Sequence, residues 1–505
     1  MKTGFRQSMA GLHTWSGLLL GWVLFVMFAC GSAAYFQEEI TRWMQPEVVA
    51  APDQASAVSA AQRWLGQHHA TSPSWFITVP GKRSAVTEVY WEPVEGAAPD
   101  APTDARLDGT GREVTARATA GGYFLYRFHY DLHYLPVIWA RYLVGVAAMF
   151  MLVAIPSGIV THKKIFIDFF MLRFGKGQRS WLDAHNVTAV LALPFHLMIT
   201  YTGLVSLASQ YVPAPIAAAY PNEAAFYADA FPQVAGGEKS GQAAPLAPLA
   251  PMIAEARRRW NGAAIGYINV AHPGDRAASV AITSAPSSGM DTRGETLRFD
   301  GVTGRPFEPP PPRGAARLTE GVMIGIHAGR YAGMPLRWLY FVSGLFGTAM
   351  IATGLILWTV KRRARLPDPA HPHLGFRIVE RLNIGVVTGF PLALAGYFLA
   401  NRLLPVTMAG RPEREIAALF VVWGAALAWA ALRPPARGWI ELSAACALAY
   451  AAVPVVSGIV TGRGLPASLV AGDTLFIAFD GMMLLLAGTF AAIAWMLAAR
   501  PRRAA

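Results

Sequence analysis

The chain has 505 residues, of which 54% are hydrophobic and 15% are charged. This balance excludes an ordinary soluble protein and indicates several membrane-spanning helices. The formal net charge of +12 does not indicate a nucleic-acid partner, because the basic residues cluster at the ends of apolar segments, where they determine membrane topology. Cys30 and Cys446 both lie in apolar segments, so neither a disulfide framework nor a thiolate metal site is expected.

Windows of about 20 apolar residues predict a polytopic α-helical membrane protein with eight spans. The first apolar run is too long for a signal peptide and no clear cleavage site follows it, so we expect a retained first helix within residues 1–36. The predicted spans are roughly 15–36, 137–160, 184–208, 336–360, 381–403, 414–433, 438–460 and 474–498.

The basic residues predict the orientation of these spans. They are concentrated in alternate connections, namely THKKIF and LRFGKGQR before the third span, KRRAR after the fourth, RPPAR after the sixth and RPRR at the chain end. By the positive-inside rule both termini are cytoplasmic, although Arg411 and Arg414 lie on the predicted outer side. Residues 361–380 then form a cytoplasmic linker, and residues 381–505 form an accessory bundle of four spans.

Two long external loops, 37–136 and 209–335, have similar patterns. Each contains a helical stretch, then two strand-like segments, then a strand that ends in a Gly-containing turn. The first reads ASAVSAAQRWLGQHH, WFITVP, TEVYWE and ARLDGTGREV; the second reads PLAPMIAEARRRW, AIGYINVAHP, AASVAIT and LRFDGVTGRPFE. The paired DGTGRE and DGVTGRP segments indicate a duplicated small α+β module.

In the first four predicted spans, histidines are the ionisable residues that occur within the apolar segments. His185 and His196 are eleven residues apart, so in one continuous helix they would lie within about 20° of each other and about 16 Å apart along the axis. A lone histidine could simply form an interhelical hydrogen bond. However, seven of the twelve histidines lie in or beside apolar segments: His13, His129, His133, His162, His185, His196 and His327. This number favours ligands, and two imidazoles on one face suit two stacked metal centres.

A series of motifs extends over about the first 365 residues: LHTWSGLLLGWVLF, YFQEEI, YRFHYDLHYLP, GIVTHKKIFIDFF, LDAHNVTAVLALPFHLMITYTGL and GIHAGRYAGMPLRWLYFVSGLFGTAMIATGLILW. In these motifs the chain resembles the PepSY-associated transmembrane proteins, a family that includes inner-membrane ferric-siderophore reductases. The resemblance implies that the two loops are periplasmic PepSY-like modules. It also implies haem b between the first four helices, and electron transfer to periplasmic ferric siderophores or other Fe(III) chelates in the bacterial inner membrane.

Each haem iron would need two neutral imidazoles at similar depth, a ligand set suited to electron transfer. At the inner side His13 with His185 is the expected pair. At the outer side His196 is expected to pair with His133 or His327. The runners-up are His162, which could support a ligand, and His129, which with His133 could also hold a separate metal ion. Arg141 and Arg337 lie at outer span ends and could pair with haem propionates or snorkel to headgroups.

Two other functions stay open from the sequence. The chain could be a non-enzymatic regulatory or assembly protein that binds a partner through its external modules. It could also transport a siderophore or a metal through the last four spans, where Asn383, Thr388 and Asp480 are the polar candidates. Because no phosphate loop, flavin fingerprint or nicotinamide site is found, a reductase would need a separate electron donor, either a cytoplasmic one or a quinol.

Overall fold

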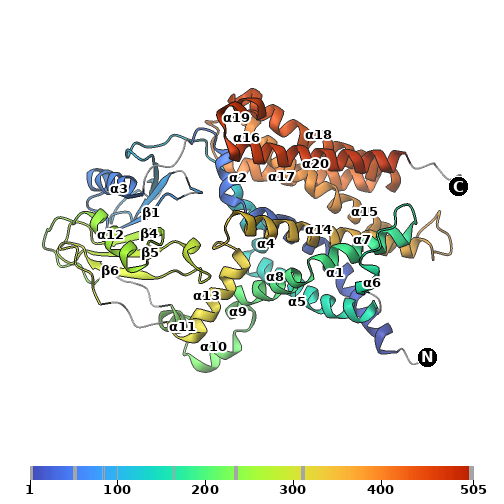
Figure 1. Cartoon of the computed structure of the whole chain (residues 1–505), viewed down its shortest axis with the longest axis horizontal. Coiled ribbons are helices and arrows are strands. Elements are labelled where there is room, and N and C mark those ends of the chain that lie inside the picture. Colours follow the sequence, from blue (N-terminus) through green and yellow to red (C-terminus); the bar gives the residue numbers. More distant parts are fainter. Residues whose placement is uncertain are drawn as a thin grey trace. The chain divides into compact units, whose positions relative to one another are not determined.

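The computed structural model describes residues 4–48, 54–81, 83–84, 86–98, 101–162, 165–231, 237–308 and 313–499 (Figure 1). Lys163 and Lys164 of the predicted cytoplasmic loop, and the terminal RPRR sequence, lie outside the described residues. The chain forms two compact units. The first comprises Met1–Pro46, Arg117–Leu204 and Leu336–Ala505, and the second comprises Glu47–Ala116 and Val205–Pro335.

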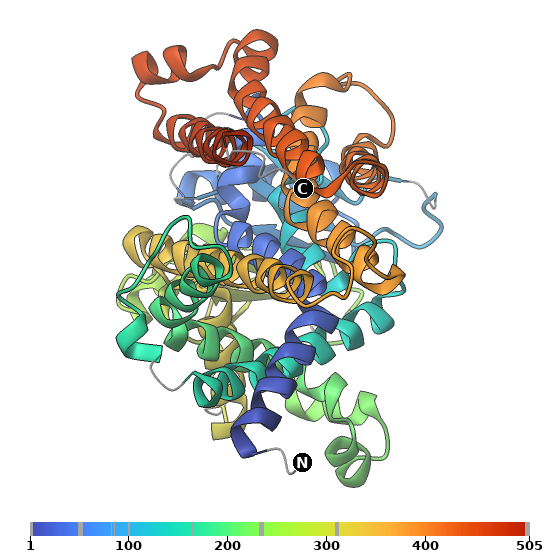
Figure 2. The same cartoon turned by 90° about the vertical axis from the view of Figure 1, so that its right-hand side faces the viewer.

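The first unit is helical, and its long helices confirm the predicted multi-pass membrane protein. Within the described residues, seven helices are long and apolar enough to cross a membrane, or eight if one bent pair is counted as a span. In chain order the helices are α1 (Phe5–Ala34), α2 (Gln37–Met44), α4 (Gly121–Asp131), α5 (Val137–Thr161), α6 (Ile165–Asp168), α7 (Gln178–Leu191), α8 (Leu193–Ser206), α14 (Met334–Arg363), α15 (Leu374–Val387), α16 (Gly389–Leu403), α17 (Arg411–Leu432), α18 (Pro435–Thr461), α19 (Leu465–Ala471) and α20 (Thr474–Ala498). The last two spans, α18 and α20, lie side by side (Figures 1 and 2).

The third span differs from the prediction because α7 and α8 meet at a bend of 67°. Pro194 stands at the second position of α8, where it has no amide hydrogen and its ring would collide with the carbonyl of Val190 in a continuous helix. The chain therefore breaks at Ala192, which leaves the helical region with φ −112° and ψ 20°. The expectation that His185 and His196 share one face of a single helix is wrong.

The first span also differs, since α1 begins at Phe5 and not near residue 15. The segment FRQSMAGLHT contains good helix-forming residues but is too polar for an apolar window to detect. His13 consequently lies inside α1 and does not precede it.

The second unit joins the two long loops into one antiparallel sheet of strand order β3-β2-β1-β4-β5-β6. Its strands are β1 (Ser74–Thr78), β2 (Thr87–Trp91), β3 (Asp104–Leu107), β4 (Ile265–Ala271), β5 (Ser279–Ser284) and β6 (Thr296–Asp300). The pairing of β1 with β4 places Trp75 opposite Val270 and Ile77 opposite Ile268. We expected two separate modules, 37–136 and 209–335. Two separate three-stranded sheets would have four edge strands and would each bury little apolar surface. Pairing of β1 with β4 covers one edge of each half, so only β3 and β6 stay at the edges of the joint sheet.

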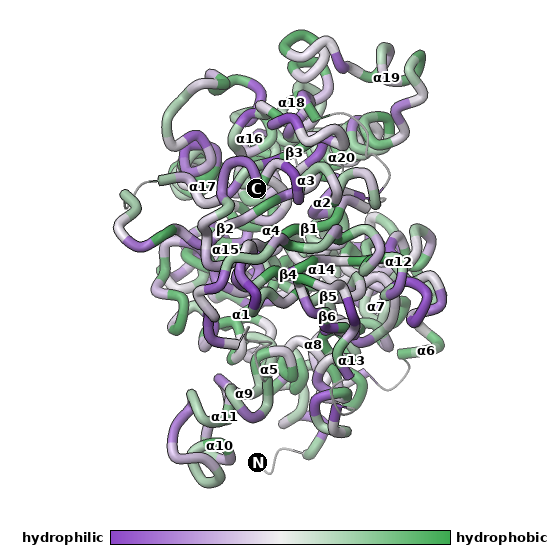
Figure 3. The backbone as a smooth tube through the Cα atoms, turned by 90° about the vertical axis from the view of Figure 1, so that its left-hand side faces the viewer, coloured by the Kyte–Doolittle hydropathy of each residue, from purple (hydrophilic) through white to green (hydrophobic). Residues whose placement is uncertain are grey.

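Helices α3 (Gln54–His68) and α12 (Leu249–Arg259) contribute to the core of this sheet, and hydrophilic residues gather around α12, whose last turn holds three arginines (Figure 3). The order of helix and three strands is the same in both halves, as the sequence pattern predicts. The remaining helices of the unit are α9 (Ala208–Tyr211), α10 (Ala214–Ala219), α11 (Glu223–Ala230) and α13 (Ala315–Ala328).

The turns after β3 and β6 are built in the same way. The Oδ1 atom of Asp108 accepts the amide hydrogen of Thr110 at 2.8 Å, and that of Asp300 accepts the amide hydrogen of Thr303 at 2.7 Å. The amide of Thr303, followed by its hydroxyl and the amide of Val302, lowers the pKa of Asp300 although partial burial opposes this. Gly111 (φ 89°) and Gly304 (φ 69°) supply the left-handed residue of each turn. This shared construction supports the predicted duplication.

Candidate functional site

His13 of α1 and His185 of α7 lie next to each other in the first unit. Their ring centroids are 6.1 Å apart and their ring planes differ by 67°. Two metal–nitrogen bonds of about 2 Å each, together with about 1 Å from each nitrogen to its ring centre, would give roughly 6 Å between centroids. The spacing of these two imidazoles is therefore suited to a shared metal ion.

Both imidazoles are oriented by a backbone carbonyl of another helix. The Nδ1 atom of His13 lies 2.9 Å from the carbonyl oxygen of Ala154 in α5. The Nδ1 atom of His185 lies 2.8 Å from the carbonyl oxygen of Met350 in α14. Because a carbonyl oxygen can only accept, each Nδ1 carries the hydrogen and each Nε2 keeps its lone pair. Metal-binding histidines are commonly held in this way by their second nitrogen.

A glycine makes room for each imidazole. A Cβ atom added at Gly158 would lie 3.2 Å from Nδ1 of His13, and one added at Gly354 would lie 3.2 Å from Nδ1 of His185. Each glycine follows the accepting carbonyl, that of Ala154 or Met350, by four residues. The small residues of the PSGIV and ATGL segments thus let the ring approach the backbone.

We predict that Gly354→Val lowers the stability of the protein. The added side chain overlaps the space of His185, and overpacking of this kind costs about 1–3 kcal/mol. The control is Gly17→Val in α1, because a Cβ at Gly17 meets no atom within 4 Å. The measurement is the apparent melting temperature of the detergent-solubilised protein. Equal melting temperatures for the two variants would contradict the packing argument.

His196 of α8 is more deeply buried than His13 and His185, with 1% of its surface exposed. Its Nε2 atom has no hydrogen-bond partner among the described residues. The nearest side chains include Phe28 of α1, whose ring centroid is 6.0 Å away, and a Cβ added at Gly347 would lie 3.2 Å from the Nε2 atom. A buried nitrogen without a partner costs about 1–3 kcal/mol, so this atom is a candidate ligand.

The structure separates the two outer candidates of the YRFHYDLHYLP segment. His133 lies in the turn after α4, packs against Phe124 and Phe420, and has Nε2 at 3.6 Å from a carboxylate oxygen of Glu413. Its Nε2 atom is buried and forms no hydrogen bond among the described residues. The structure shows no contact between His133 and His196 among the described residues, and their pairing stays a prediction.

His129 instead faces α1, because a Cβ at Gly31 would lie 3.8 Å from its ring. His129, a runner-up among the ligands predicted from the sequence, thus faces the same side of α1 as His196, since Gly31 and Phe28 are one helical turn apart. His327 lies on α13 in the second unit, and its ligand role stays a prediction.

His162 is the residue that ends α5, as predicted. Its Nε2 atom lies 2.9 Å from the amide nitrogen of Asn186, and Asn186 directly follows His185 in α7. An amide nitrogen donates this bond, so the lone pair of His162 is engaged and this histidine fits a supporting role. The sequence signal for Asn186 is a polar residue directly after a histidine in an apolar helix, and the structure shows that its side chain is buried.

The two arginines predicted to meet propionates have carboxylate partners. The Nε atom of Arg141 donates to Asp131 at 2.8 Å, and Arg337 donates to Glu39 at 2.9 Å. Both ion pairs lie at ends of spans, and they tie α5 to α4 and α14 to α2. Binding of propionates by these arginines stays a prediction.

One comparison with known proteins matches a region that contains all of the candidate histidines discussed above. Residues 10–361 match the family model for the PepSY-associated TM region. The chain belongs to this family. No protein with a curated description matches the chain. The family region ends within α14, so the accessory bundle α15–α20 lies outside it. Among the described residues no cluster of three or more His, Cys, Asp or Glu side chains could hold a metal ion.

Buried ionic residues, which the sequence analysis did not identify as important, fasten the accessory bundle to the family region. Arg411 and Glu415 of α17 are fully buried and form an ion pair. Glu415 also accepts from the hydroxyl of Thr119 at 2.6 Å and from the amide of Asn401 at 2.7 Å. The guanidinium of Arg402 lies 3.8 Å from the ring centroid of Trp43. These contacts join α16 and α17 to α2 and to the segment before α4.

The polar residues of the last spans take part in helix packing. Asn383 accepts from the indole of Trp22 at 2.8 Å and donates to the carbonyl of Leu355 at 2.9 Å. Oδ1 of Asp480 accepts from the indole of Trp43 at 3.1 Å, and the hydroxyl of Thr388 donates within its own helix. These contacts give the three transport-path candidates a structural role.

We predict that Arg411→Met strongly destabilises the protein. The change leaves the buried carboxylate of Glu415 without its cation, which costs about 3–5 kcal/mol. Arg414→Met on the exposed face of the same helix is the matched control, and it should leave the apparent melting temperature unchanged. A small effect of Arg411→Met, equal to that of Arg414→Met, would show that this pair does not hold the bundle.

Proposed function

We propose that this protein is a haem b-containing reductase of the bacterial inner membrane. It passes electrons across the membrane to a periplasmic ferric siderophore or other Fe(III) chelate and releases Fe(II). The observation that carries the proposal is the His13–His185 pair, whose Nδ1 atoms are both bonded to carbonyl oxygens and whose centroids are 6.1 Å apart. The family assignment supports a membrane protein of this architecture.

The residues present fit haem b. A haem iron would take two imidazole ligands from the protein, and His13 and His185 form such a pair. His13 and His185 would hold one haem, and the partnerless Nε2 of His196 would hold a second, with His129 as the other candidate ligand. A bound bis-histidine haem supplies reversible one-electron transfer.

Residues of the chain exclude water from the His13–His185 pair and orient its two imidazoles. The apolar side chains around α1, α5 and α14 exclude water, and the carbonyls of Ala154 and Met350 fix the tautomer of each imidazole. His162 and Asn186 close the end of the site that the charge pattern predicts to be cytoplasmic. Electrons enter there from a cytoplasmic donor or from a quinol.

The substrate would be reduced at the opposite, periplasmic end. Hard oxygen donors of a siderophore bind Fe(III) much more tightly than Fe(II), so one-electron reduction releases the iron. Such a chelate is too large to enter a packed helical core.

The first test is the visible absorption spectrum of the purified protein. We expect the reduced bands of haem b with about two haems per chain, and His185→Ala should lose about one of them, because each iron needs both imidazoles. His371→Ala is the control, since its side chain is 86% exposed and lies in the linker between α14 and α15. A wild-type protein expressed with ample haem that is colourless would falsify the proposal.

The second test separates the two centres. The protein is reduced, freed of reductant and mixed with a ferric siderophore, and its reoxidation is followed by stopped flow together with trapping of Fe(II). His196→Ala should keep the haem of His13 and His185 but slow reoxidation at least about tenfold, because the terminal electron carrier is lost. His371→Ala should react as the wild type. Wild-type rates in His196→Ala would remove His196 from the electron path.

A further inference from the structure

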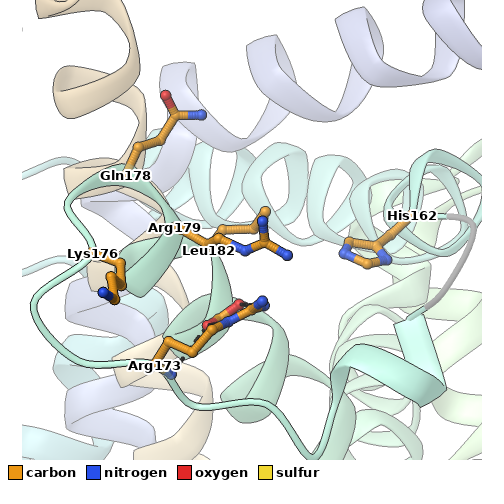
Figure 4. A pocket seen from close by; sticks show the side chains of 7 residues that line it. His162, Arg173, Lys176, Gln178, Arg179 and Leu182 are labelled. Atoms are coloured by element: carbon orange, nitrogen blue, oxygen red, sulfur yellow. Dashed lines mark hydrogen bonds and ion pairs between the residues drawn. The ribbon is translucent and has the colours of Figure 1, made fainter.

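A pocket of about 350 Å³ lies at the end of α5 and the start of α7 (Figure 4). All of its lining residues belong to the first unit. They are His162, Arg173, Lys176, Gln178, Arg179, Leu182 and Asp183. Figure 4 shows His162 at the right of the view, Arg179 near the middle, Arg173 below and Lys176 at the left.

The pocket has a surplus of positive charge. Arg173 is held by Asp183 through two side-chain bonds, of 2.7 Å from Nε and 2.8 Å from a terminal nitrogen. Among the residues that the structure describes, Lys176 and Arg179 form no ion pair with a carboxylate. The first turn of α7, which begins at Gln178, adds the positive end of a helix dipole. The pocket is therefore suited to an anion with several acceptor oxygens.

The neighbouring segment is apolar and exposed. Between residues 166 and 174 the large exposed hydrophobic side chains are Phe166, Ile167, Phe170, Met171, Leu172 and Phe174, of which Phe170 is 84% exposed. In water so many exposed aromatic and aliphatic groups would be unfavourable, whereas a membrane interface accommodates them. The charge pattern predicts that this end of the spans is cytoplasmic, where anionic lipid headgroups attract basic residues.

We propose that this pocket binds the phosphate of an anionic phospholipid, with Lys176 and Arg179 as its main contacts. A phospholipid satisfies both observations, because its phosphodiester neutralises the surplus charge and its acyl chains cover the segment 166–174. Soluble phosphate shares the headgroup chemistry but would leave the apolar segment exposed. The inference does not depend on haem or on reductase activity. The wall residue His162 contacts Asn186, so a bound lipid would lie beside the His13–His185 pair.

The test is native mass spectrometry of the full chain in detergent, with phosphatidylglycerol or phosphatidylcholine of the same acyl chains. We expect preferential retention of phosphatidylglycerol. The double variant Lys176→Gln/Arg179→Gln should weaken that retention about tenfold or more. Lys361→Gln/Arg365→Gln is the matched control, because it removes two exposed charges at the end of α14. It should retain the lipid as the wild type does.

Two further arms decide the source of the phosphate and the role of the fold. Inorganic phosphate at a concentration equal to that of the lipid should not displace phosphatidylglycerol, and displacement would overturn the lipid as ligand. Phe170→Ser/Phe174→Ser should weaken lipid retention at unchanged charge. Melting temperatures of all variants in phosphatidylcholine must match, so that unfolding is not read as lost binding. Equal lipid retention by the pocket variant and its control would overturn the site.

Discussion

Two hydrogen bonds from imidazole nitrogens to backbone carbonyls set the orientation of the histidines on which the candidate site depends. His13 reaches Ala154 in α5 and His185 reaches Met350 in α14, so two side chains link four helices. Each bond needs a gap in the facing helix, and Gly158 and Gly354 provide it. Inside a membrane such bonds are worth only about 1 kcal/mol each, so their main effect is to set the direction in which each Nε2 lone pair points.

The third span bends at Ala192, yet its two histidines face the same two helices. His185 of α7 lies beside His13 of α1 and Gly354 of α14. His196 of α8 lies beside Phe28 of α1 and Gly347 of α14. The proline at the start of α8 therefore changes the direction of the span by 67° but leaves both imidazoles between α1 and α14.

Outside the family region, polar contacts determine which helices pack against each other, because apolar packing selects poorly between helices in lipid. Lipid tails are as apolar as leucine, so burial alone hardly distinguishes one helix partner from another. The Arg411–Glu415 pair and the Asn383 contacts provide directional bonds, and they attach the accessory bundle in one defined arrangement. The second unit is stabilised differently, because each of the two loops contributes three strands to one shared sheet.

The sequence by itself determined the membrane class, the positions of most spans and the helix–strand–strand–strand order of both loops. These follow from local composition and periodicity, which a single stretch of chain carries. The pairing of His13 with His185 was expected from their shared inner-side depth and from the family resemblance, and the structure places the two rings next to each other. Only the tertiary structure decided that His129 rather than His133 faces α1, that Glu415 and Arg411 are buried, and that β1 pairs with β4. Such outcomes depend on which distant segment packs on which face, and that choice depends on the summed contacts of many residues far apart in the sequence.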